Sequence, residues 1–266
     1  MNQGLFGKRS RALLGAMLAT DFKVRYQGSV LGYLWSLVRP LSLFVILYIV
    51  FAHFLKMGAN IPHYASYLLM GVLVWSFFAE ATSNALGSLV DRGDLMRKVK
   101  VPRYSVVLVA VLSAAVNFFI NLVVVLSVIL IVGAEPEFWA LLTLPLLLLE
   151  LLIFTTCLGL ALSVLYVKYR DVKYIWELFL QVAFYATPII YALSRVPEKY
   201  HIFMAFNPMM QIIQDMRYFV ITDQSITTWG ILGHKKSLAW AIAWMIFCGV
   251  CLGYFRRNID NVAESL

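Results

Sequence analysis

The sequence predicts an all-α integral membrane protein with six transmembrane helices, and two observations lead to this fold class. Of the 266 residues, 62% are hydrophobic and 14% are charged, whereas a soluble domain is roughly 45–50% apolar. Six segments also approach the length of about 20 mostly apolar residues that a membrane-spanning helix needs. They are residues 33–55, 64–88, 104–132, 138–166, 174–191 and 237–255. Because no repeat or composition shift marks a second unit, we expect a single transmembrane domain over 1–266.

The basic residues are unevenly distributed around these segments. Most of the 22 Lys and Arg residues precede the first segment, lie between the second and third, or flank the later segments on the same side. Because cytoplasmic loops carry the excess of Lys and Arg, we expect a multi-pass protein of a cytoplasmic membrane with both termini in the cytoplasm. The net charge of +8 then reflects membrane topology, and we expect no nucleic-acid partner.

Residues 5–24 precede the first span and have the pattern of an amphipathic helix. Apolar residues recur at helical spacing while basic residues occupy the other positions, which is typical of a helix lying on a membrane surface. The apolar positions are Leu13, Leu14, Met17, Leu18 and Phe22. The alternative is an ordinary basic flank that only fixes the topology.

Residues 90–103, "VDRGDLMRKVKVPR", are expected to form a short cytoplasmic helix between the second and third spans. Asp94 lies three and four residues before Arg97 and Lys98, a favourable spacing on a helix, and Pro102 ends the pattern. The alternative is a solvated loop.

Residues 192–230, before the last span, are apolar yet broken by prolines, and their uncharged runs are too short to cross a bilayer. Apolar runs of about 10–14 residues are typical of re-entrant or interfacial segments. We therefore expect two short helices entering from the outer face, the alternative being a long extracytoplasmic loop.

Two helical faces are candidates for lining a passage, because polar groups inside spans are costly and often functional. The fifth span carries a polar and aromatic face formed by Tyr174, Glu177, Gln181, Tyr185 and Pro188. The first span carries an aromatic face, suited to stacking on sugar rings, formed by Tyr33, Phe44, Tyr48 and Phe51. In a chain with 15% aromatic residues, a chance stripe is the alternative for the second face.

Catalytic and metal-binding patterns do not stand out in the sequence. Cys157, Cys248 and Cys251 lie inside apolar segments, where a packing role is expected. The four His residues form no ligand-spaced pair. "GLFGKRS" at 4–10 lacks the spacing of a phosphate-binding loop. We therefore expect no enzyme, no metal and no bound cofactor in this chain.

Several motifs follow one another along nearly the whole chain. They are "RYQGSVLGYLWSLVRPL" from 25, "DLMRKVKVPR" from 94, "YRDVKY" from 169, "ATPIIYALSRVPEKY" from 186, "FNPMMQIIQDMRYFV" from 206 and "YFRRNIDNVAESL" from 254. In this order they resemble the membrane subunits of ABC-type exporters for polysaccharides and teichoic acids.

The resemblance implies partners and roles that composition does not give. Two copies would form a homodimer around a channel, with two cytoplasmic ATPase subunits beneath them that bind ATP and Mg. The surface helix 5–24 would lie near the cytoplasmic gate, and 187–230 would lie at the outer exit. A coupling segment would insert into each ATPase, formed here by Asp91, Arg92, Asp94, Leu95, Met96, Arg97 and Lys98.

The resemblance also implies a substrate, a glycan carried on an undecaprenyl-type lipid with its pyrophosphate near the cytoplasmic interface. Arg25 and Arg39 are candidates to contact this phosphate, since Arg presents a planar donor fork. Snorkelling to lipid headgroups is the alternative for Arg25, and pairing with a buried carboxylate such as Glu177 is the alternative for Arg39. The cargo remains open among O-antigen of lipopolysaccharide, capsule, galactan and teichoic acid, with a secondary transporter or a membrane-embedded enzyme as the rivals from other classes.

Overall fold

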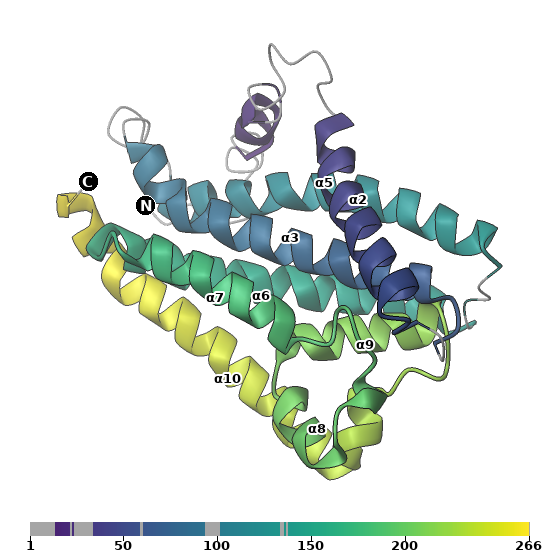
Figure 1. Ribbon diagram of the computed structural model, residues 1–266. Helices are drawn as coiled ribbons and strands as arrows, with labels where there is room; N and C mark the ends of the chain where they lie inside the picture. Colours follow the sequence, from purple (N-terminus) through teal and green to yellow (C-terminus); the bar gives the residue numbers. More distant parts are fainter. Residues whose placement is uncertain are drawn as a thin grey trace.

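The protein is a bundle of long helices with a group of short helices at one end (Figure 1). The computed structural model describes residues 14–21, 23, 34–58, 61–93, 102–133, 136 and 138–265. In this part of the chain every regular element is helical. The all-α prediction is therefore confirmed for the described residues.

The long helices begin and end within a few residues of the expected apolar segments, apart from the last, which is longer. They are α2 (Leu34–Tyr48), its π-helical continuation η1 (Ile49–Phe54), α3 (Tyr64–Asp91), α5 (Arg103–Ile131), α6 (Ala140–Lys168), α7 (Val172–Ala186) and α10 (Thr228–Ser265). α10 contains a break at Gly233, whose φ of 67° is left-handed. Residues 14–21 are helical as expected of the surface helix, and 94–101, most of the expected coupling helix, lie outside the described residues.

Helix α3 forms the centre of the bundle. In its most apolar stretch 78% of the residues are buried, against 44% in α5, 28% in α6 and none in α2. The contact between α3 and α6 is close because Gly159 of α6 meets Ala85 of α3, where a Cβ on the glycine would lie 2.7 Å from the alanine Cβ. Small residues of this kind allow two membrane helices to approach closely.

Five helices of the described chain are long and apolar enough to cross a membrane, namely α2 with η1, α3, α5, α6 and residues 236–259 of α10. The expected fifth span is shorter than the predicted 174–191. α7 ends at Ala186 after 15 residues, which at about 1.5 Å per residue is roughly 22 Å. The helix stops because Pro188 disfavours helical backbone at the preceding residue.

The region before α10 contains η2 (Leu193–Arg195) and two short helices, α8 (Glu198–Ala205) and α9 (Pro208–Val220). The side chain of Asn207 caps α9 by accepting a hydrogen bond from the Met209 amide at 3.0 Å, and Pro208 occupies the first turn, where its missing N–H costs nothing. α9 packs on α6 and α3 with Met210, Ile212 and Met216 fully buried. The two short helices are thus present, while their re-entry into a membrane stays a prediction.

A buried arginine connects α9 to the loop that follows α7. Arg217 is 0% exposed, and its guanidinium donates to the carbonyls of Pro188 and Ile189, both at 2.7 Å, and of Tyr67 at 3.0 Å. It also lies 3.4 Å from the centre of the Tyr67 ring. Because arginine stays charged in proteins, these carbonyls and the aromatic face take the place of water around it.

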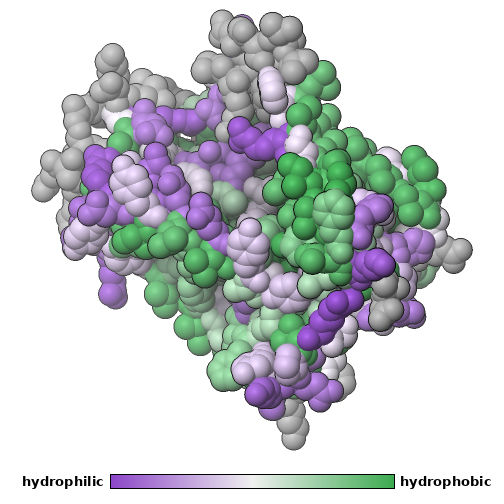
Figure 2. Space-filling view, in the orientation of Figure 1, coloured by the Kyte–Doolittle hydropathy of each residue, from purple (hydrophilic) through white to green (hydrophobic). Residues whose placement is uncertain are grey.

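The opposite end of the bundle, where α3 and α6 end and α5 and α7 begin, carries Arg92, Arg103, Lys168 and Arg170, and we call it the basic end. Figure 2 shows hydrophilic residues gathered there and hydrophobic residues over α2. Arg103 donates to the Ile259 carbonyl at 2.7 Å, which holds the end of α10 against the start of α5. The charged residues therefore also connect helices at this end.

Candidate functional site

The candidate site is a cavity of about 1080 Å³ between α2, α3, α5 and α7. Its wall combines aromatic rings with hydroxyl, amide and charged groups. The lining residues that matter for the chemistry are Trp35, Arg39, Trp75, Ser76, Glu80, Ser83, Asn84, Asn117, Asn121, Gln181, Phe184 and Tyr185. Such a wall offers hydrogen bonds to hydroxyl groups and flat apolar faces, which together match the two sides of a sugar ring.

Amide groups of α5 support this wall by bonding to neighbouring helices. Asn117 donates to Glu80 of α3 at 3.3 Å, and Asn121 donates to the Ser36 carbonyl of α2 at 3.3 Å. Ser113, one turn before, donates to Asp21 at 2.6 Å. These three residues of α5 therefore form a row that hydrogen-bonds to groups outside their own helix.

Asn84 on α3 differs from the other amides of the cavity. Its Nδ2 is buried and has no hydrogen-bond partner among the described residues. A buried donor without a partner costs about 1–3 kcal/mol, so a bound hydroxyl or phosphate oxygen would recover that energy. One signal for this group is visible in the sequence, because Ser76, Glu80, Ser83 and Asn84 share helical spacing on α3.

Three of the predicted site residues come together in this cavity. Arg39 enters from α2, and Gln181 and Tyr185 enter from α7. Glu177 instead lines a separate cavity of about 120 Å³ that includes Asp91, Lys173 and Trp176. The alternative role for Arg39, as the buried partner of a carboxylate such as Glu177, gains no support, because Arg39 is exposed and the two residues line different cavities.

The predicted aromatic face of α2 lies beside the core of the bundle. Phe44, Tyr48 and Phe51 are half-buried and pack against it, and Tyr48 stacks on Phe44 at 5.7 Å and on Tyr64 of α3 at 6.4 Å between ring centres. None of the three is among the residues that line the large cavity. Their part in a passage stays a prediction.

The other residues predicted to line the channel or its entrance lie outside both cavities or outside the described residues. Tyr174 is 70% exposed at the start of α7, and Pro188 is buried after its end, where its carbonyl accepts from Arg217. Arg25 and Tyr33 lie outside the described residues.

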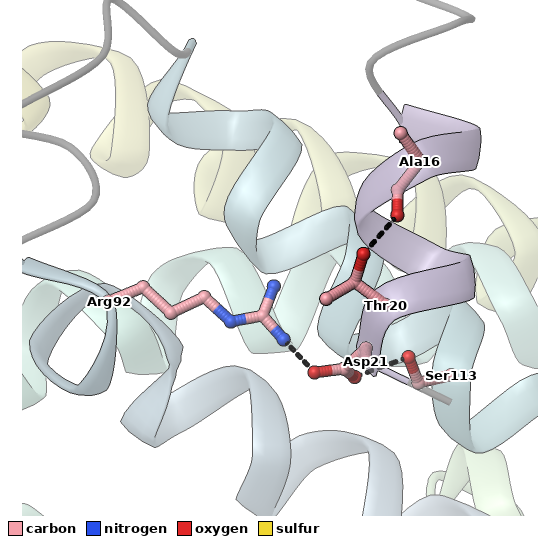
Figure 3. Close-up of polar contacts among 5 residues, drawn as sticks. All are labelled: Ala16, Thr20, Asp21, Arg92 and Ser113. Atoms are coloured by element: carbon pink, nitrogen blue, oxygen red, sulfur yellow. Dashed lines mark hydrogen bonds and ion pairs between the residues drawn. The ribbon is translucent and has the colours of Figure 1, made fainter. Parts of the chain in front are cut away.

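Of the predicted coupling residues, Asp91 ends α3 and Arg92 follows it. Arg92 forms an ion pair with Asp21 of the helix at 14–21, as Figure 3 shows. The remaining five, Asp94, Leu95, Met96, Arg97 and Lys98, lie outside the described residues. Sequence reasoning did not single out Asp21, although an acidic residue within a basic amphipathic helix was a visible signal.

Comparison with known proteins places these features in a family. The model of the ABC-2 type transporter family matches residues 12–221. The chain is 32% identical to the O-antigen export system permease protein RfbA of Klebsiella pneumoniae over 254 residues, which covers 96% of this chain and 95% of that relative. It is 30% identical to the RfbA protein of Myxococcus xanthus over 205 residues, covering 76% of this chain and 78% of the relative.

A more distant relative is the polysialic acid transport protein KpsM of Escherichia coli, 18% identical over 206 residues that cover 77% of this chain and 80% of the relative. The predicted resemblance to membrane subunits of ABC exporters is confirmed by the family match and by the two relatives that are at least 30% identical. The chain belongs to the ABC-2 type transporter family.

Proposed function

We propose that this chain is the channel-forming permease subunit of an ATP-driven exporter that moves a lipid-linked cell-surface polysaccharide across the bacterial cytoplasmic membrane. The observation that carries the proposal is the similarity to O-antigen permeases along 96% of the chain. The cavity supports it, because aromatic rings and amides converge there from four helices. We take the lipid to be of the undecaprenyl type, whose pyrophosphate suits the Arg39 guanidinium.

The proposed assembly is a homodimer with one ATPase subunit beneath each copy, in which ATP and Mg bind to the ATPase. The basic end then faces the cytoplasm, because Lys and Arg concentrate on the cytoplasmic side of membrane proteins. In this orientation α7, followed by 187–190, forms the fifth of six crossings, and α8 and α9 form re-entrant helices at the outer exit. Arg97 and Lys98 would then contact the ATPase.

A polysaccharide fits the cavity better than the rival cargo does. A teichoic acid is a polyol-phosphate chain, and the repeated phosphates would favour a wall with several cations. Among the twenty residues that line the large cavity, Arg39 is the cation and Glu80 is the carboxylate. The wall is otherwise uncharged, which suits the hydroxyl groups of a neutral glycan.

A depletion experiment tests the proposed function. When the protein is depleted from its own cells, lipid-linked polymer should accumulate in the cytoplasm and the surface glycan should fall. A depleted strain that shows normal surface glycan and no internal polymer would refute the proposal. Accumulated polyol-phosphate polymer would indicate the teichoic-acid exporter, and transport in liposomes without ATP would indicate a secondary transporter.

A variant pair tests the cavity itself. Gln181→Trp places a large ring in the cavity and should reduce export at least about tenfold while ATP hydrolysis continues. Val182→Trp is the matched control, since Val182 is 61% exposed on α7 and is not one of the residues lining the cavity. Equal export by the two variants would remove this cavity from the path of the glycan.

A further inference from the structure

Asp21 is the point at which the helix at 14–21 contacts two other helices through charged and polar groups. One carboxylate oxygen of Asp21 pairs with Arg92, which follows α3, and the other accepts a hydrogen bond from the Ser113 hydroxyl of α5 at 2.6 Å. Figure 3 shows Asp21 between these two partners. Each oxygen of the carboxylate therefore has a partner from a different helix.

The surroundings make this contact stronger than a surface ion pair. The side chains of Arg92 and Asp21 are 22% and 27% exposed, so water screens their attraction only in part. Among the described residues of this helix, Met17 also packs against the core, and its contact is apolar. Because apolar packing is non-directional, Asp21 fixes the position of the helix relative to α3 and α5.

Arg92 lies next to the segment through which a movement of the ATPase would be transmitted to this chain. It follows Asp91, the last residue of α3, and precedes 94–98 by two residues. Under the proposed function, 94–98 is the part of the chain that docks on the ATPase. Because Gly93 alone separates Arg92 from Asp94, the chain between them spans at most about 7 Å, and a larger displacement of the docking segment moves Arg92 with it.

We propose that Asp21 is a positioning residue for transport, which links the ATPase-docking segment to the surface helix through Arg92 and Ser113. The inference rests on the proposed function of the chain as an exporter permease. Displacement of the docking segment moves Arg92, and the ion pair carries that displacement to the helix at 14–21. ATP hydrolysis without this contact leaves the surface helix in place, so that less glycan is exported for each ATP consumed.

The test uses the full complex of the permease and its ATPase, and it measures ATPase copurification, ATP hydrolysis and glycan export. Asp21→Arg and Arg92→Asp should each lower the glycan exported per ATP by about fivefold, the order expected when one half-buried ion pair is lost. The ATPase should still copurify with both variants. The double variant, with both substitutions, should recover export to within about twofold of the native protein, because the ion pair is restored in reverse.

Two further variants separate a linking role from an anchoring role. Asp21→Glu keeps the carboxylate and should retain most of the coupling, whereas Thr20→Arg adds the same cation one residue away as a control. Thr20 is exposed and donates to the Ala16 carbonyl within its own helix at 2.8 Å. Export per ATP for Thr20→Arg should therefore stay within about twofold of the native protein.

Three outcomes would overturn the inference. The first is normal export per ATP in both single variants. The second is failure of the double variant to recover export while it is inserted and bound to the ATPase. The third is loss of ATPase copurification together with export, which would show that Asp21 only maintains the docking segment. In all three cases depletion of the native protein would still abolish surface glycan, so the proposed function would stand.

Discussion

Replacing Arg217 with methionine should destabilise the protein more than any other Arg→Met change in the part of the chain that the structure describes. Methionine has a similar volume and can fill the site, but it donates no hydrogen bond. The carbonyls of Pro188 and Ile189 follow the end of α7, outside regular helix, and Arg217 donates to both at 2.7 Å. In Arg217→Met both carbonyls lose this donor in a buried position.

The magnitude follows from these contacts. Each buried carbonyl left without a donor costs about 1–3 kcal/mol, and loss of the cation over the Tyr67 ring costs about 1–2 kcal/mol. Removing a buried charge returns part of this cost, because the charge no longer has to be kept out of water. We therefore expect the free energy of unfolding to fall by about 3 kcal/mol.

The measurement is chemical unfolding in detergent, followed by tryptophan fluorescence. Arg195→Met is the matched control, because Arg195 is exposed and donates to one carbonyl, that of Met57, at 3.0 Å. It should lose less than about 1 kcal/mol. Tyr64→Phe should fall between them, with a loss of about 1 kcal/mol, since the Tyr64 hydroxyl donates to the Ile190 carbonyl at 2.7 Å. Equal stability of Arg217→Met and Arg195→Met would refute the reasoning.

Helix packing, the cavity wall and the coupling segment each lead to one further prediction. Gly159→Val should lower the free energy of unfolding by about 1–3 kcal/mol, because its Cβ would lie 2.7 Å from that of Ala85. Gly249→Val is the control, since a Cβ at Gly249 meets no neighbouring atom within 4 Å. Equal melting temperatures of the two variants would contradict the close packing of α3 and α6. Asn84→Leu should leave the melting temperature unchanged or raise it, since the Asn84 amide nitrogen has no partner among the described residues. The same variant should lower export. A lower melting temperature with normal export would show that this amide serves the fold. Replacing Arg97 and Lys98 with Glu should reduce ATPase copurification while the chain remains inserted, and unchanged copurification would remove these two residues from the coupling surface.

The long helices were predictable because their signal is local. An apolar run of sufficient length gives a helix whatever lies beside it, and α3 begins at Tyr64 as the pattern indicated. The start of α9 was also local, because Asn207 and Pro208 form a standard helix entry. The early end of α7 had a local signal too, since Pro188 restricts the residue before it, but hydropathy continued the segment to 191.

The polar contacts were not predictable, because their partners are far apart in the sequence. Arg217 has no distinguishing pattern in the sequence, yet the three carbonyls that accept from it lie 28, 29 and 150 positions earlier. Asp21 and its partner Arg92 are 71 positions apart. Neither pairing produces a periodic pattern, so only the packing of the helices reveals which charges meet.

The distribution of burial indicates which helices separate at the lowest cost. In the most apolar stretches of α2 and α3 the buried shares are 0% and 78%, so moving α2 away from the bundle breaks far fewer packing contacts between helices than moving α3. α7 buries Trp176 and otherwise has mostly exposed or half-buried side chains. These two helices line the large cavity together with α3 and α5, which are more buried. A change in the width of the cavity therefore costs least when α2 and α7 move and the core of α3, α5 and α6 remains intact.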